Sequence, residues 1–104
     1  MQSGSEFGTL LKALIKDAGM TQTQFYLELG IKKPYFYDIV SGRVNPPPKD
    51  LQFKALDILK TDAEKKKQFF DLAARERGDV PADITKWVED DPNAVTAIRQ
   101  VMNK

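Results

Sequence analysis

Residues 21–42 read TQTQFYLELGIKKPYFYDIVSG and carry the strongest structural signal in this chain of 104 residues. Two short segments flank Gly30, and on each side of it apolar residues recur at helical spacing: Phe25, Leu29, Phe36, Ile39 and Val40. Two helices of this length joined by a tight turn are a common means of setting one helix in the major groove of DNA. The stretch therefore predicts a helix-turn-helix in which helix 33–41 reads DNA.

Signals for helix ends delimit these two helices and one helix before them. Apolar residues between positions 7 and 18 follow a helical stripe, which Gly19 is expected to end in the left-handed conformation. Thr21 and Gln24 have the spacing of a capping box at the start of the next helix. Pro34 falls in the first turn of the helix after that, where proline is tolerated.

The remainder of the chain also predicts helices, after a rigid proline-rich connector at residues 45–48. The residues expected to open these helices are Asp50, Thr61 with Glu64 in a second capping box, and Asp91 followed by Pro92. A further short helix is expected between Pro81 and Glu89. No alternating run of apolar and polar residues is long enough for a useful strand. The predicted fold class is therefore all-α, a compact helical bundle with a short C-terminal helical extension.

We divide the chain into three parts. Residues 1–6 are expected to be a flexible tail or an expression remnant, residues 7–60 the DNA-binding domain, and residues 61–104 a helical extension. The extension either packs on the core or forms a dimer face. Trp87 is expected in the core, whereas both possibilities stay open for the apolar residues of the last helix: Val95, Ile98, Val101 and Met102.

The composition argues against several kinds of function. The chain has no cysteine and no histidine, which removes disulfides, thiol nucleophiles and zinc sites built on those residues. No motif for catalysis or phosphate binding is present, so we expect no enzyme, no cofactor, no metal and no small-molecule ligand. The formal net charge is only +1. No apolar run reaches the ~20 residues of a membrane span, and the expected location is the cytoplasm, away from any membrane.

A helical wheel of residues 33–41 separates an inward face from an outward one. The outward residues near its start are the candidates for base contacts: Lys33, Pro34, Tyr37 and Asp38. Polar side chains around this helix are the candidates for phosphate contacts: Gln22, Lys32, Tyr35, Arg43 and Asn45. Because operators are commonly paired half-sites, we expect double-stranded DNA to be bound by a homodimer.

The stretch from Gly19 to Pro46 resembles the helix-turn-helix of phage-repressor-like transcriptional regulators, the XRE family. The matching residues are Thr21, Gln22, Phe25, Gly30, Ile31, Ile39, Gly42 and Pro46. The resemblance covers residues 7–60 well and the rest loosely. It implies a lambda-repressor-like DNA-binding bundle that regulates transcription. It also implies a set of DNA contacts: phosphate at Gln22, bases at Lys33, Pro34 and Asp38, and backbone near Tyr35 and Arg43.

Three features depart from the family pattern. Tyr26 stands where the family usually has a small alanine, Val40 and Ser41 replace a Glu-Arg pair, and Pro34 replaces a polar reader. Tyr26, together with Asp38 and the low net charge, keeps a second function open. In that alternative the same fold is a protein-interaction module, antirepressor-like or a scaffold.

Overall fold

The computed structural model describes residues 5–103, and all regular structure in that range is helical. The helices follow one another along the chain as α1 (Glu6–Asp17), α2 (Gln22–Leu29), α3 (Lys33–Ser41), α4 (Lys49–Leu59), α5 (Ala63–Arg77), α6 (Ala82–Asp90) and α7 (Ala94–Met102). None of these helices is long and apolar enough to cross a membrane. The predicted all-α class is thus confirmed for the described part of the chain.

The ends of α2 and α3 follow the local signals in the sequence. Thr21 and Gln24 form the predicted capping box: the Thr21 hydroxyl accepts from the Gln24 amide at 3.0 Å, and the Gln24 side chain accepts from the Thr21 amide at 2.9 Å. Gly30 and Gly42 end the two helices with φ of 84° and 79°. This left-handed conformation is strained for residues with a Cβ atom, so glycine determines where each helix stops.

Two predicted caps after the proline-rich connector are wrong. α4 follows Pro48 with no capping side chain, and Asp50 is already inside its first turn. At the start of α5 the cap is Asp62, whose carboxylate accepts from the Lys65 amide at 2.8 Å, and not Thr61 with Glu64. Aspartate is a better N-cap than threonine, so the helix begins one residue later than the pattern predicted.

The start of α7 also differs from the prediction. Asp91 ends α6 with extended backbone, and its carboxylate accepts from the Asn93 amide at 2.9 Å. α7 begins only at Ala94, with Asn93 before it and no capping side chain. Because Asp91 and Pro92 belong to the turn between the two helices, they are not the cap and first residue of α7.

The assignment of residues 1–6 to a tail is wrong for its last two residues. Ser5 is the N-cap of α1, and its hydroxyl accepts from the Gly8 amide at 2.8 Å. Glu6 is the first residue of that helix, where a negative charge is favourable. The other four residues lie outside the described part of the chain.

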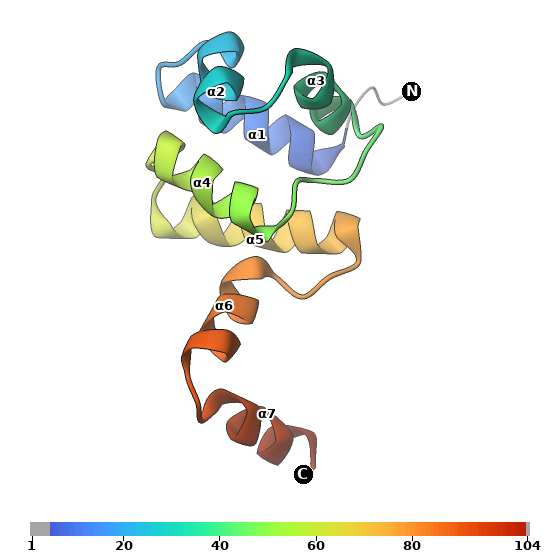
Figure 1. The fold of residues 1–104 in the computed structure, drawn as a ribbon, viewed down its shortest axis with the longest axis vertical. Coiled ribbons are helices and arrows are strands. Elements are labelled where there is room, and N and C mark those ends of the chain that lie inside the picture. The colour runs from blue at the N-terminus through green and yellow to red at the C-terminus, as the bar shows by residue number, and fades with distance from the viewer. Residues whose placement is uncertain (1–4, 104) are drawn as a thin grey trace.

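One hydrophobic core joins α1 to α5, with α1 packed against both α3 and α5 (Figure 1). Its largest fully buried side chains are Phe7, Phe25, Phe36, Phe69, Ile15 and Ile39. The rings of Phe7 and Phe69 lie 4.9 Å apart between centroids and join the first helix to the fifth. α5 is therefore part of the same core as α1–α4. It packs against α1, and α1 in turn packs against α3.

Gly8 lets α1 and α3 approach closely. A Cβ atom at this position would meet the carbonyl oxygen of Val40 and lie 2.7 Å from its Cα atom. Both are backbone atoms of α3, so neither can rotate away as the end of a side chain can. The contact between α1 and α3 thus depends on the missing side chain of Gly8.

A contact across the fold satisfies the start of α1. The Phe7 amide donates to a carboxylate oxygen of Glu76 at 3.0 Å, 69 residues along the chain. Glu76 lies near the end of α5, so it caps α1 from another helix and ties the two together.

Removing this contact should cost about 1–2 kcal/mol of unfolding free energy, because a charged acceptor of a helix-end amide is lost. We expect Glu76→Ala to lower the midpoint of urea unfolding, and Glu76→Gln to recover part of the loss. Asp71→Ala, at an exposed position on the same helix, is the control and should change little. Equal midpoints for Glu76→Ala and wild type would contradict the capping role.

α6 and α7 form an arm that projects from the body made by α1–α5 (Figure 1). The molecule accordingly measures 46 × 30 × 22 Å, with α2 and α3 at one end and α7 at the other. The expectation that Trp87 lies in the core is wrong, since 49% of this residue is exposed. α6 touches the body with its other side, so the apolar side that holds Trp87 stays uncovered.

Candidate nucleic-acid interface

The packing between α2 and α3 is built on aromatic rings. Phe36 of α3 lies with its centroid 6.1 Å from Phe25 and 5.5 Å from Tyr26, both on α2. In the turn, the Ile31 amide donates to the Tyr26 carbonyl at 3.1 Å. Only 8% of Tyr26 is exposed, so this tyrosine belongs to the core and is not available as a surface contact.

α3 places three of its four predicted base readers on open surface. Phe36, Ile39 and Val40 point into the core, as the wheel predicted. On the other side, Lys33, Pro34 and Tyr37 are exposed. The Lys33 ammonium lies 5.9 Å from the centroid of the Tyr37 ring, which is the range of a weak cation–π contact. These residues share one outward surface near the start of the helix.

Asp38, the fourth predicted reader, is half-buried and already engaged. Its carboxylate lies 3.8 Å from the Arg43 guanidinium. Its backbone carbonyl accepts from the amides of Arg43 and Val44, at 2.9 and 3.3 Å. Because the Arg43 side chain is 77% exposed, the ion pair is worth little and the guanidinium can leave it at small cost.

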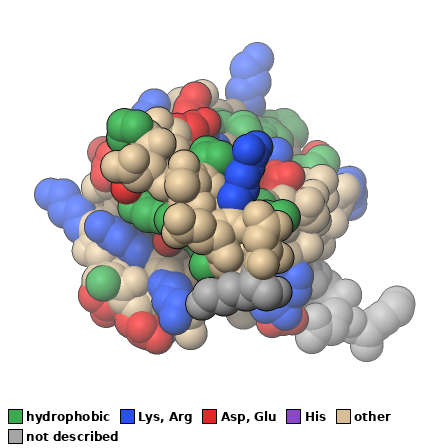
Figure 2. All heavy atoms as spheres, turned by 90° about the horizontal axis from the view of Figure 1, so that it is seen from below, with side chains coloured by type: hydrophobic (Ala, Val, Ile, Leu, Met, Phe, Trp, Pro, Cys, Tyr) green, Lys and Arg blue, Asp and Glu red, His purple; other side chains and the backbone are tan. Residues whose placement is uncertain are grey.

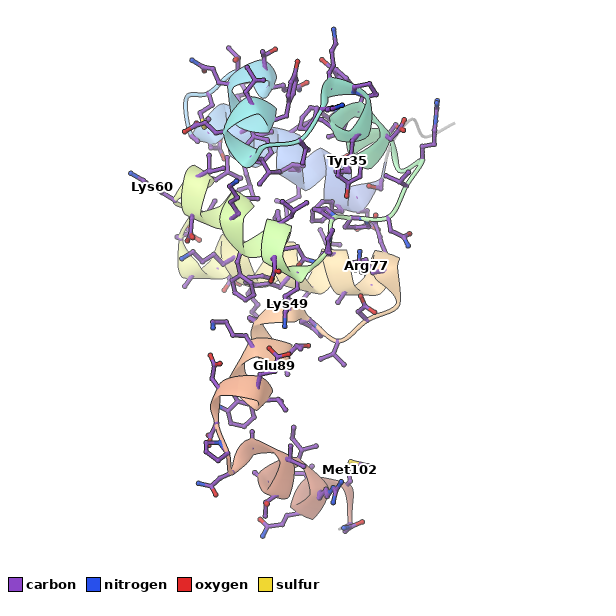
Figure 3. The ribbon with its side chains drawn as sticks, viewed as in Figure 1. Tyr35, Lys49, Lys60, Arg77, Glu89 and Met102 are labelled. Atoms are coloured by element: carbon purple, nitrogen blue, oxygen red, sulfur yellow. The ribbon has the colours of Figure 1, made fainter. Side chains whose placement is uncertain are left out.

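The predicted phosphate contacts lie on both sides of α3. Gln22 is the first residue of α2, and Lys32 is the N-cap of α3. Arg43 and Asn45 are exposed in the segment that follows α3. Tyr35 is half-buried and packs against the core, which leaves only part of its surface for a ligand (Figure 3). Four of the five candidates thus lie at or just beyond the ends of α2 and α3, as contacts to a DNA backbone require.

The charge at the start of α3 is unusual for a helix. α1, α4, α5 and α6 each carry an acidic residue in the first turn, which complements the positive end of the helix dipole. α3, like α2 and α7, has no acidic residue there, and like α7 it has no capping side chain; Lys32 and Lys33 occupy the position instead. Two cations therefore lie at the positive end of the helix dipole, where an anion would be favourable.

The uncapped start of α3 was not predicted, although the sequence contains a signal for it. The four residues directly before Pro34, at positions 30–33, include no serine, threonine, aspartate or asparagine, which are the usual N-caps. The absence of a cap next to two lysines could have drawn attention to the start of α3 as an anion site.

Other parts of the described structure have fewer groups that could bind a ligand. A cavity of about 340 Å³ lies where α6 meets α4 and α5, and its lining includes Lys49, Gln52 and Arg77. Arg77 donates to Asp79 and to the Pro46 carbonyl, and Lys49 to Glu89, so its cations are engaged within the protein. Among residues 5–103, no group of acidic side chains is placed to hold a metal ion.

Comparisons with known proteins add no assignment to this geometry. Searches of protein-family models, of curated proteins and of solved structures find no match to the chain. The features of the chain that point to a function are therefore α2, the turn, α3 and the charges around them.

Proposed function

We propose that this protein is a sequence-specific DNA-binding transcriptional regulator that sets α3 in the major groove. In this proposal the body is a lambda-repressor-like domain of the XRE type, and it acts as a homodimer on paired half-sites. Lys33, Pro34, Tyr37 and Asp38 contact bases. Gln22, Lys32, Tyr35, Arg43 and Asn45 hold phosphates.

The uncapped, cationic start of α3 is the observation that carries the proposal. Lys32 and Lys33 lie where the helix dipole disfavours positive charge, and no carboxylate of the described chain pairs with either of them. A phosphate at this point would offset the positive end of the helix dipole and bind the Lys32 ammonium group. The exposed outward face of α3 lies next to it, where base edges would be.

The ion pair between Asp38 and Arg43 supports a role for Arg43 both before and after DNA binds. In the free protein the guanidinium neutralises Asp38, which otherwise repels the DNA backbone. On binding, Arg43 can turn to a phosphate while Asp38 turns to a cytosine amino group. The weak ion pair then costs little to break.

A titration with DNA tests the proposal. Selection from random duplexes supplies the best site, and affinity for it is measured against random DNA at several salt concentrations. We expect a linear salt dependence with a slope of about −0.9 for each phosphate contact. Arg43→Ala should weaken all duplexes equally and reduce this slope, whereas Lys33→Ala should cost ~1–3 kcal/mol at one base position. Lys66→Ala, on the exposed face of α5, is the matched control.

The result that would reject DNA binding is equal, salt-independent affinity for selected and random duplexes. Equal losses on both kinds of DNA for Lys33→Ala would reject only its role as a base reader. In that case Lys33 would join the phosphate contacts.

The alternative function, a protein-interaction module, is favoured by one feature, the exposed ring of Tyr37 on α3. A partner would cover this ring and pair with Asp38. Under this alternative Tyr37→Ala abolishes retention of the partner from nuclease-treated lysate. Under DNA binding it lowers affinity for the selected duplex instead.

A further inference from the structure

α6 is attached to the body by its polar side. Ala82, its first residue, is buried in the core, and Thr85 is half-buried. Glu89 accepts from the Lys49 ammonium at 2.7 Å, and Figure 3 shows these two side chains between α4 and α6. Residues 82, 85 and 89 follow the spacing of one helix face, so this face is turned toward α4 and α5.

The opposite side of α6 is apolar. At about 100° per residue, Ile84 and Trp87 fall across the helix from Ala82 and Glu89, and the half-buried Val88 lies between the two sides. Ile84 and Trp87 are each nearly half exposed. Since Ala82 on the other side is buried in the core, α1–α5 of the same chain cannot cover this apolar side unless α6 undocks.

α7 extends the uncovered surface. Its apolar residues recur at helical spacing, and Ala94 is the one that is buried. The exposed ones are Val95, Ile98, Val101 and Met102. Val101 and Met102 are 67% and 74% exposed. Seen from the α7 end, hydrophobic side chains reach the surface at several points (Figure 2).

Helices of this kind need a partner. α6 and α7 have nine residues each, and isolated helices shorter than about 12–15 residues are marginal in water. Most of their stability must come from packing of an apolar face. α7 has its apolar face open, apart from Ala94.

We propose that a second copy of this chain covers the arm face, defined as Ile84, Trp87, Val95, Ile98, Val101 and Met102. A two-fold contact brings a surface against itself, so like charges in its centre would repel. The arm face carries no charge, and the charged groups of α6 lie beside it. Lys86 already pairs with Asp90 at 2.9 Å on the same helix. The face therefore suits its own copy better than a partner chosen by charge.

The area agrees with a stable dimer. Large apolar residues expose on the order of 200 Å² when fully open, and these six keep about half of their surface exposed. Each copy thus offers at most roughly 600 Å², and a symmetric pair would bury at most roughly 1,200 Å², which is the lower limit of specific interfaces. For a single chain of this size, an apolar patch that large is at the upper limit of what monomers expose.

The inference deepens the proposed function, because it names the surface by which two DNA-reading units are joined. α3 lies at the far end of the molecule from α7 (Figure 1). A two-fold axis close to the long axis of the molecule places both α3 helices on one side of the dimer. That arrangement suits two half-sites about one DNA turn, ~34 Å, apart.

The test is the mass of the full chain in solution, measured without DNA by sedimentation or light scattering at micromolar concentration. We expect twice the chain mass of 11.8 kDa for the wild type. Ile98→Glu with Val101→Glu should halve this mass and keep the helical circular dichroism of the body. Leu27→Glu, at an apolar position on α2 about as exposed as Val101, is the control and should stay dimeric.

A wild type that sediments at the monomer mass would overturn the proposal, as would a double variant that stays dimeric. DNA titration separates this inference from the proposed function. A dimer without affinity for any duplex supports the interface and rejects the DNA reading. A monomer that binds a selected duplex supports DNA reading and rejects the interface.

Discussion

Replacing Lys32 and Lys33 together by glutamate should lower affinity for the selected duplex by about 100-fold, roughly 2.7 kcal/mol. Both ammonium groups lie at the uncapped start of α3, where we propose that a phosphate binds. Reversing their charge replaces attraction by repulsion at that point. The salt dependence should fall as well, by about one phosphate contact, that of Lys32. Fluorescence anisotropy at three salt concentrations measures both quantities.

The same change should leave the fold intact and make it slightly more stable. Carboxylates at the start of a helix are favourable by ~0.3–1 kcal/mol each, whereas lysines there are unfavourable. A rise in the urea midpoint together with a loss of DNA affinity would separate the effect of these two residues on helix stability from their role in DNA binding. Lys65→Glu with Lys66→Glu, in the first turn of α5, is the control for net charge. A similar loss of affinity in that control would refute a local role for Lys32 and Lys33.

Gly8→Ala should destabilise the protein by about 2–3 kcal/mol, although alanine is the better helix former. The new Cβ atom would meet the backbone carbonyl of Val40 and force α1 and α3 apart. Backbone atoms cannot move alone, so the strain extends along both helices. Urea unfolding monitored by circular dichroism measures the effect.

Thr9→Ala is the matched control, since Thr9 is exposed one residue further along α1. It should be neutral or slightly stabilising, as helix propensity alone predicts. An unchanged or higher midpoint for Gly8→Ala would show that α1 and α3 can separate without loss. A loss of DNA affinity in folded Gly8→Ala would also indicate that α1 sets the position of α3.

Local signals were sufficient for most of the helices. The periodic apolar residues of α1, α2 and α3 are the ones that the structure buries, because a helix has one face toward the core. Gly30 and Gly42 ended helices as predicted, since the left-handed conformation depends on the residue alone. The outward position of Lys33, Pro34 and Tyr37 followed from the same periodicity.

The incorrect caps have a common physical cause. At the start of α5 two adjacent residues, Thr61 and Asp62, could both cap, and a difference of about 1 kcal/mol or less decides between them. Before α4 and α7 the helix begins without a capping side chain. Residue types show which positions could begin a helix. Which of these positions does so depends on the path of the backbone before it, and the residue types alone do not give that path.

Trp87 illustrates a limit of another kind. Its spacing with Ile84 and Val88 correctly indicated one apolar side of α6, but spacing does not say what covers that side. The direction of the helix was decided by Ala82 in the core, while the exposed pair of Lys49 and Glu89 adds little. These contacts turn the polar side inward, so the apolar side is open.

Residue spacing and helix-end signals thus placed the helix-turn-helix and its outward face, because both depend on neighbours within a few positions. Three other features depend on groups far apart in the chain: the Gly8 contact with Val40, the Glu76 cap on α1, and the direction of the arm face. Each is set by how helices meet in space, and the packing of the whole core selects that arrangement.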